Sequence, residues 1–180
     1  MGELQESQDA IFKLLMFGDG GVGKTSLTQR YVTGVFVESQ HITIGVDFHI
    51  KDLTCEGINV KLQVWDFGGE ERFRFLLPSY CRGAAGGLFL YDITNVTSLS
   101  HIADWMKIIR ENAGPIPVMI VGSKADLAQK RKVQASEAVA LAKAQKLRGF
   151  AEVSAKTGEN VDATFESITN LMLKQSGLIA

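Results

Sequence analysis

The sequence has few of the residues that mark disulfide-rich or metal-binding proteins. It holds only two cysteines, Cys55 and Cys81, without CxxC or metal-type spacing, so we expect a reducing, cytoplasmic compartment. Its three histidines are scattered at 41, 49 and 101 and form no zinc or iron pattern. A formal net charge of −1 gives no general attraction to nucleic acid, and we expect no nucleic-acid partner.

Long apolar runs are also missing. No stretch approaches the ~18 residues that a transmembrane helix needs. Glu6 stands where a myristoylation signal requires Ser or Thr, and residues 176–180 hold no cysteine to prenylate. We therefore expect no membrane anchor within these residues, and we expect a monomer.

The sequence does contain short apolar runs that alternate with helical segments. The runs that we expect to be strands are 11–17, 45–53, 59–66, 87–91, 118–121 and 150–153. The expected helices are the alanine-rich 135–144 and two segments with apolar stripes, Leu99, Ile102, Met106 and Ile109, then Val161, Phe165, Ile168, Leu171 and Met172. Ser98 and Asn160 are the expected N-caps of the last two.

This alternation predicts an α/β fold: a doubly wound, six-stranded, mostly parallel sheet with helices on both faces. Strands 45–53 and 59–66 flank residues 55–57 too closely for a crossover, so they should form one antiparallel hairpin. We expect a lead-in over 1–9, one domain over 10–175 and a tail over 176–180. In such a sheet ligands bind beyond the carboxyl ends of the strands.

A phosphate-binding loop follows the first expected strand. Residues 18–25 read GDGGVGKT, which matches GxxxxGK[ST] between a strand and a helix, the pattern of P-loop NTPases. Glycines let backbone N–H groups point at phosphate oxygens, Lys24 would reach the β and γ phosphates, and Thr25 would ligate Mg²⁺. The expected phosphate contacts are Gly20, Gly21, Val22, Gly23, Lys24, Thr25 and Ser26. A glycine-rich turn without ligand is the alternative.

Three further short motifs follow later strands. Asp66 and Gly69 form a DxxG pattern, in which Asp66 could hold Mg²⁺ through water and Gly69 could donate to a γ phosphate. Asp126 could accept the two N–H groups of guanine that adenine lacks. The third motif is Ser154-Ala155-Lys156. Each motif is weak alone, but their order at strand ends predicts a guanine nucleotide.

Over about residues 11–174 the chain resembles the Ras superfamily, and within it the Rab branch. The stretches that carry the resemblance are IGVDF at 44–48, KLQVWD at 61–66, ERF at 71–73 and SYCRGA at 79–84. The resemblance implies a GTP/GDP switch with Mg²⁺ that hydrolyses GTP. Segments 36–45 and about 67–80 would be the two switches, ordered by GTP.

The resemblance also implies roles by position. Phe36 and Lys124 would flank the guanine ring, and Ala155 would offer its N–H to the guanine carbonyl. Ser123, Ser154 and Lys156 would complete the base site. The implied metal ligands are Thr25, Thr43 and Asp66, and the implied catalytic residues are Lys24, Thr43 and Glu70.

Several positions depart from the family pattern, among them Cys81, which replaces a usual tyrosine. Glu70 replaces the usual glutamine; ionised glutamate only accepts hydrogen bonds and opposes the phosphate charge, which predicts slow intrinsic hydrolysis. A partner's arginine or a protonated Glu70 could rescue the rate, and a tolerated substitution is the alternative. Ser123 replaces asparagine, so we expect fewer contacts to the purine and the phosphate loop. Phe67-Gly68 replaces Thr-Ala, and we expect the aromatic side chain of Phe67 to be exposed.

The expected partners are effectors, exchange factors and GTPase-activating proteins. The resemblance implies that Phe48, Trp65 and Tyr80 form an aromatic patch that effectors read, whereas alternation alone places Phe48 in the core. The leading function is a hydrolysing GTPase switch in membrane traffic or signalling. The alternatives are a nucleotide-dependent binding module that scarcely hydrolyses GTP, and a P-loop phosphotransferase, for which no lid-sized insertion exists.

Overall fold

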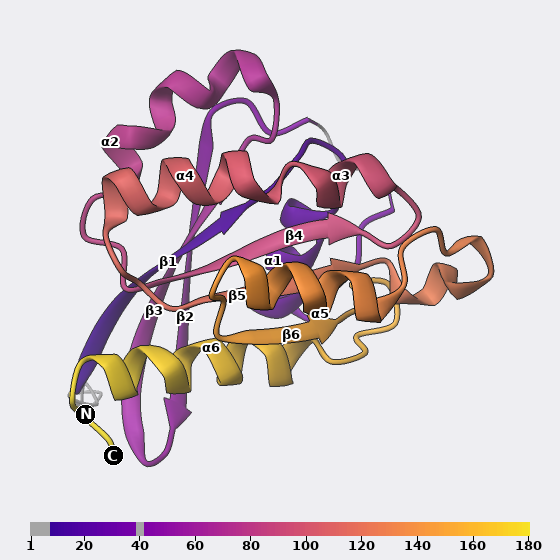
Figure 1. The fold of residues 1–180 in the computed structure, drawn as a ribbon. Helices are drawn as coiled ribbons and strands as arrows, with labels where there is room; N and C mark the ends of the chain where they lie inside the picture. Colours follow the sequence, from indigo (N-terminus) through magenta and orange to yellow (C-terminus); the bar gives the residue numbers. More distant parts are fainter. Residues whose placement is uncertain (1–7, 39–41) are drawn as a thin grey trace.

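One mixed sheet organises the chain (Figure 1), and the computed structural model describes residues 8–38 and 42–180. The strand order is β2-β3-β1-β4-β5-β6. The strands are β1 (Ala10–Phe17), β2 (Val46–Cys55), β3 (Ile58–Phe67), β4 (Gly86–Asp92), β5 (Val118–Ser123) and β6 (Gly149–Glu152). The helices are α1 (Lys24–Thr33), α2 (Leu77–Cys81), α3 (Val96–Ser100), α4 (Ile102–Ala113), α5 (Ala135–Ala144) and α6 (Val161–Gln175), with 3₁₀ turns η1 (Glu71–Leu76) and η2 (Ala125–Lys130).

The predicted fold class is confirmed. Strands β3, β1, β4, β5 and β6 are parallel, and β2 alone is antiparallel, to β3. The turn between β2 and β3 consists of Glu56 and Gly57, both with positive φ (52° and 78°), which is the backbone that a two-residue hairpin favours. As a result the carboxyl ends of β1, β3, β4, β5 and β6 lie at the same edge of the sheet.

Helices cover both faces of the sheet, which explains the near-continuous apolar strands. Helices α1 and α6 pack on one face, where the ring of Tyr31 stacks on Phe165 with centroids 3.8 Å apart. Helices α2, α3, α4 and α5 cover the other face, where Trp105 is fully buried near Phe17. Figure 1 shows α3 and α4 end to end along that face.

Several local predictions were wrong. Ser98 is not an N-cap: α3 begins earlier, and Asn95 caps it by accepting from Thr97 N. Asn160 is the N-cap residue of α6, as predicted, but its side chain donates to the Glu152 carbonyl and makes no capping hydrogen bond. Phe67, expected to be exposed, is fully buried because it ends β3 on the face that α2 covers.

The remaining expectations concern anchors and thiols. Within the described residues, no helix is both long and apolar enough to span a membrane. Cys55 and Cys81 are both buried and free, and burial raises the pKa of Cys81 to about 11, so it stays a thiol at neutral pH. The expected lead-in falls mostly on residues 1–7, which lie outside the described part of the chain.

We predict that Phe165→Ala lowers the free energy of unfolding by about 3–5 kcal/mol, because it removes a fully buried ring that joins α6 to Tyr31 of α1. Urea unfolding at fixed nucleotide concentration measures this change. Phe75→Ala is the matched control: Phe75 is 75% exposed, so its loss should change stability by no more than about 0.5 kcal/mol. Equal effects of the two substitutions would contradict the packing argument.

Candidate nucleotide and magnesium site

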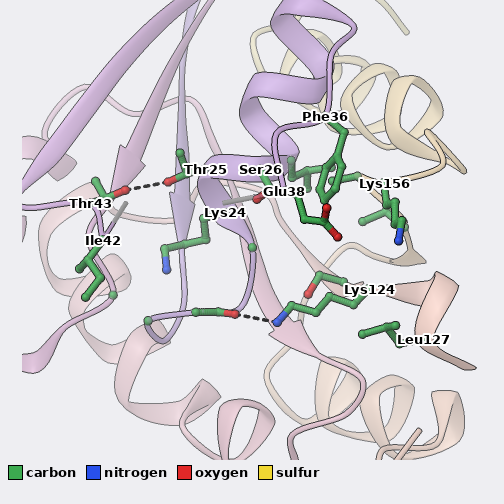
Figure 2. Close-up of a pocket in the computed structure, with 18 of the residues that line it drawn as sticks. Lys24, Thr25, Ser26, Phe36, Glu38, Ile42, Thr43, Lys124, Leu127 and Lys156 are labelled. Carbon is green, nitrogen blue, oxygen red and sulfur yellow. Dashed lines mark hydrogen bonds between the residues drawn. The ribbon is translucent and has the colours of Figure 1, made fainter. Parts of the chain in front are cut away.

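The strand ends surround a pocket of about 640 Å³ (Figure 2). Fifteen of the eighteen predicted site residues line it: Gly20, Gly21, Gly23, Lys24, Thr25, Ser26, Phe36, Thr43, Gly69, Glu70, Ser123, Lys124, Asp126, Ala155 and Lys156. Val22, Asp66 and Ser154 do not line the pocket, but each contacts a residue that does. The structure therefore brings the predicted set together.

The phosphate loop wraps around a buried ammonium group. Lys24 Nζ donates to the carbonyl oxygens of Gly18 at 2.8 Å and Asp19 at 2.7 Å, and the residue is only 5% exposed. Gly18 has a φ of 138°, and a Cβ there would collide with the Leu90 carbonyl, so the loop requires glycine at this point. Burial lowers the pKa of Lys24 to about 8, although Asp66 and Asp19 oppose the shift. A bound phosphate would favour the charged form.

Three oxygen-bearing side chains meet beside Lys24. The Thr25 hydroxyl lies 2.7 Å from the Thr43 hydroxyl and donates to Asp66 Oδ2 at 2.5 Å. Figure 2 shows Thr25 and Thr43 facing one another across the pocket wall. Burial raises the pKa of Asp66, and the hydrogen bond from Thr25 opposes that shift.

This oxygen set suits Mg²⁺, which prefers oxygen ligands and retains several waters. Asp66 Oδ1 is buried without a hydrogen-bond partner among the described residues, so it could accept from a metal-bound water. Within residues 8–38 and 42–180, no cluster of three His, Cys, Asp or Glu could hold a metal by itself. Phosphate oxygens would have to complete the coordination.

Lys124 bridges the base side of the pocket to the phosphate loop. Its Nζ donates to the Gly21 carbonyl at 2.9 Å and pairs with Asp92 Oδ2 at 2.7 Å. Burial by itself raises the pKa of Asp92, but hydrogen bonds from Lys124 and Thr94 outweigh it, so the pKa lies below its usual value. Phe36 lies across the pocket from Lys124 (Figure 2).

Asp126 is oriented from the neighbouring loop. Ser154 is fully buried, and its hydroxyl donates to Asp126 Oδ1 at 2.7 Å. The same hydroxyl accepts from Thr157 N at 3.1 Å. Ser154 thus links the loop after β6 to the loop after β5 through Asp126, which lines the pocket.

Ser123 contacts the phosphate loop despite its short side chain. Its hydroxyl bonds the Val22 carbonyl and also the Tyr91 carbonyl at 2.9 Å, and the expectation that it makes fewer contacts than asparagine stays a prediction. The residue is 4% exposed at the end of β5, next to the phosphate loop, so a hydroxyl is long enough. The single proton must be shared between two carbonyl oxygens.

Glu70 lines the pocket, as predicted, and its carboxylate is paired with the side chain of Arg72. Glu70 Oε2 accepts from Arg72 Nε at 2.5 Å. The arginine side chain is 67% exposed, so the pair is weak and easily broken. From the sequence we considered an arginine from a partner and did not anticipate this pair within the chain.

Some functional positions were missed from the sequence. Glu38, Ile42 and Leu127 also line the pocket. Leu127 directly follows Asp126, and an apolar residue in that polar loop was a usable signal. Asp92 was missed too, although a carboxylate directly after the fourth expected strand stands at the edge where ligands bind.

The three predicted aromatic residues, Phe48, Trp65 and Tyr80, are in contact with one another. The ring centroids of Phe48 and Trp65 are 5.0 Å apart, and those of Trp65 and Tyr80 are 5.7 Å apart. Phe48 is 42% exposed, so the alternation that placed it in the core was misleading. Its side chain lies on the end of the sheet face that α2 to α5 leave uncovered.

Comparisons with known proteins agree with this geometry. A family model described as "Ras family" matches residues 13–174. The chain is 43% identical over 175 residues to the Ras-related protein Rab-13 of Canis lupus familiaris, an alignment that covers 97% of this chain and 86% of that protein. It is 40% identical over 166 residues to Rab-19 of Xenopus laevis, covering 91% and 78%, and 37% identical over 174 residues to human Rab-19, covering 96% and 80%.

We predict that Ser154→Ala weakens GDP binding roughly tenfold, because it removes a hydrogen bond to the ionised Asp126 that orients it. Titration with a fluorescent GDP analogue measures the affinity. Ser167→Ala is the control, since Ser167 is exposed on α6 and its hydroxyl donates to the Ala163 carbonyl of the same helix. A Ser154→Ala protein with unchanged affinity would show that Asp126 does not need this support.

Proposed function

The chain belongs to the Ras family, and from this membership we propose that its 640 Å³ pocket holds GTP or GDP together with Mg²⁺. It is a Rab-like small GTPase, which hydrolyses GTP to GDP and acts as a GTP-dependent switch. The alternative of a module that scarcely hydrolyses GTP is not favoured. The proposals below concern residues, metal and partners.

The observation that carries the residue assignment is the meeting of Thr25, Thr43 and Asp66. Thr43 belongs to segment 36–45, Thr25 to the start of α1, and Asp66 to the end of β3, so three distant parts of the chain supply oxygens at one point. Three oxygens at one point suit a cation whose other ligands are phosphate oxygens and water. It supports segment 36–45 as a switch that responds to the γ phosphate.

The phosphate chemistry follows from the loop. Lys24 would hold the β and γ phosphates, and Mg²⁺ bound by Thr25 and Thr43 would neutralise charge on the phosphate oxygens. Backbone N–H groups of the loop and the amino end of α1 would bind the remaining oxygens. Gly69 would donate to the γ phosphate from the other switch, residues 67–80.

Guanine selection would rest on Asp126, which can accept from the two N–H groups on one edge of guanine. Adenine lacks that pair and would leave the carboxylate without partners. Phe36 and Lys124 would enclose the ring, and the Lys124–Asp92 pair keeps the lysine extended over the pocket. Leu127 adds an apolar contact that the sequence analysis did not include.

Glu70 is proposed to make intrinsic hydrolysis slow. The carboxylate can accept from an attacking water but cannot donate to the γ phosphate. Its pair with Arg72 reduces the repulsion from phosphate, which supports retention of some activity. A GTPase-activating partner would raise this slow rate of GTP hydrolysis.

The patch of Phe48, Trp65 and Tyr80 is proposed as the effector surface. It adjoins both switches, and large exposed aromatic rings commonly anchor protein interfaces. Similarity to Rab proteins supports a role in membrane traffic through effectors, exchange factors and GTPase-activating proteins.

Removing Mg²⁺ with a chelator should speed GDP release. In the Thr25→Ala variant, the Mg²⁺ concentration needed to slow GDP release should be roughly 10–100-fold higher than in the parent. Stopped-flow release of a fluorescent GDP analogue measures both effects. Thr33→Ala, at the far end of the same helix, is the matched control and should respond as the parent does. A rate of GDP release that does not depend on the Mg²⁺ concentration would refute the proposed metal site.

Single-turnover hydrolysis of bound GTP tests the role of Glu70. We expect slow phosphate release by the parent and a rate roughly tenfold higher for Glu70→Gln, equivalent to about 1.4 kcal/mol of barrier. Glu71→Gln is the control, because Glu71 is exposed and does not line the pocket. A Glu70→Gln protein that is no faster would mean that the substitution is merely tolerated.

A further inference from the structure

The Asp19 carboxylate lies at the junction of three elements and is not explained by nucleotide binding. Its Oδ2 bonds His101 Nδ1 at 2.6 Å, and its Oδ1 accepts from Trp105 Nε1 at 2.9 Å. Trp105 is fully buried, and the Asp19 side chain is 18% exposed. Helix α4 and the residue before it therefore hold this carboxylate in one orientation.

The third partner comes from segment 67–80. A guanidinium nitrogen of Arg74 lies 3.5 Å from Asp19 Oδ1, and the guanidinium stands over the Trp105 ring at 4.5 Å. A charge pair and a cation–π contact thus act on the same side chain. The Arg74 side chain is 22% exposed, which shields the pair from solvent more than a surface pair.

Little else holds this part of the chain. No residue of η1 is buried, and Phe75 is 75% exposed. At the start of the segment, Gly69 lies so close to the backbone of Asp19 and Gly20 that a Cβ would collide with both. Arg74 and Gly69 therefore fasten the two ends of residues 69–74 to the phosphate loop, Arg74 at the Asp19 side chain and Gly69 against the backbone of Asp19 and Gly20.

We propose that Asp19, oriented by His101 and Trp105, is the docking site for Arg74 and holds segment 67–80 in its catalytic position. Arg74 is a positioning residue: it sets where Gly69 and Glu70 stand and does not itself line the pocket. When the γ phosphate leaves, Gly69 loses its partner and Arg74 undocks. The inference rests on the proposed function and adds a contact that links segment 67–80 to α4.

Single-turnover hydrolysis and GDP affinity together test the positioning role. Arg74→Gln and Asp19→Asn should each slow hydrolysis by roughly tenfold or more, while Arg74→Gln leaves GDP affinity within roughly threefold of the parent. The double variant should be no slower than the slower single variant, because both remove one contact. Arg82→Gln removes an equal charge just after α2 and should hydrolyse as the parent does.

Tryptophan fluorescence gives a second readout that does not need turnover. The chain has two tryptophans, so a Trp65→Phe background reports Trp105 alone. Its emission should differ between GDP and a non-hydrolysable GTP analogue, and Arg74→Gln should abolish the difference. A parent protein that binds nucleotide but never hydrolyses it would contradict the proposed function. In that case the difference in Trp105 emission between GDP and the GTP analogue would still test whether Arg74 docks on Asp19. Unchanged hydrolysis and a persistent fluorescence difference in Arg74→Gln would overturn the inference.

Discussion

The burial of one ammonium group, that of Lys24, shapes the whole site. A lysine that is 5% exposed needs several oxygen partners, and the phosphate loop supplies two carbonyls by folding back over it. The loop can take this course only because residue 18 is a glycine, since a Cβ there would collide with the Leu90 carbonyl. The path of the loop is therefore set by contacts within the protein itself.

The two switch segments meet on that loop. Gly68 N donates to the Gly45 carbonyl at 2.7 Å, which joins the second segment to the first. Thr43 then lies beside Thr25, and Gly69 lies against Asp19. Each contact is a glycine or hydroxyl contact rather than a large apolar one, so the segments can separate at low cost once a phosphate is lost.

The fold and most of the site could be predicted because their signals are local. GDGGVGKT lies in the loop between β1 and α1, and apolar runs mark strands that are covered on both faces. The errors have a common cause, since they depend on neighbours far along the chain. Phe48 alternates like a core residue but lies where no helix covers the sheet, and Phe67 was expected outside but is covered by α2. Ser123 reaches the phosphate loop because β5 ends beside it.

The amino-acid sequence by itself determined the type of fold, through the alternation of apolar runs and helical segments, and the phosphate loop, through the spacing within residues 18–25. The selection of guanine by Asp126 stays a prediction. Only the tertiary structure decided which charges meet: Glu70 with Arg72, Lys124 with Asp92, and Asp19 with Arg74 and His101. His101 lies 82 residues from Asp19 in the chain, and no local pattern encodes such a contact. Pairing of this kind depends on how strands and helices pack, and the energy of one side-chain pair becomes available only after that packing has formed.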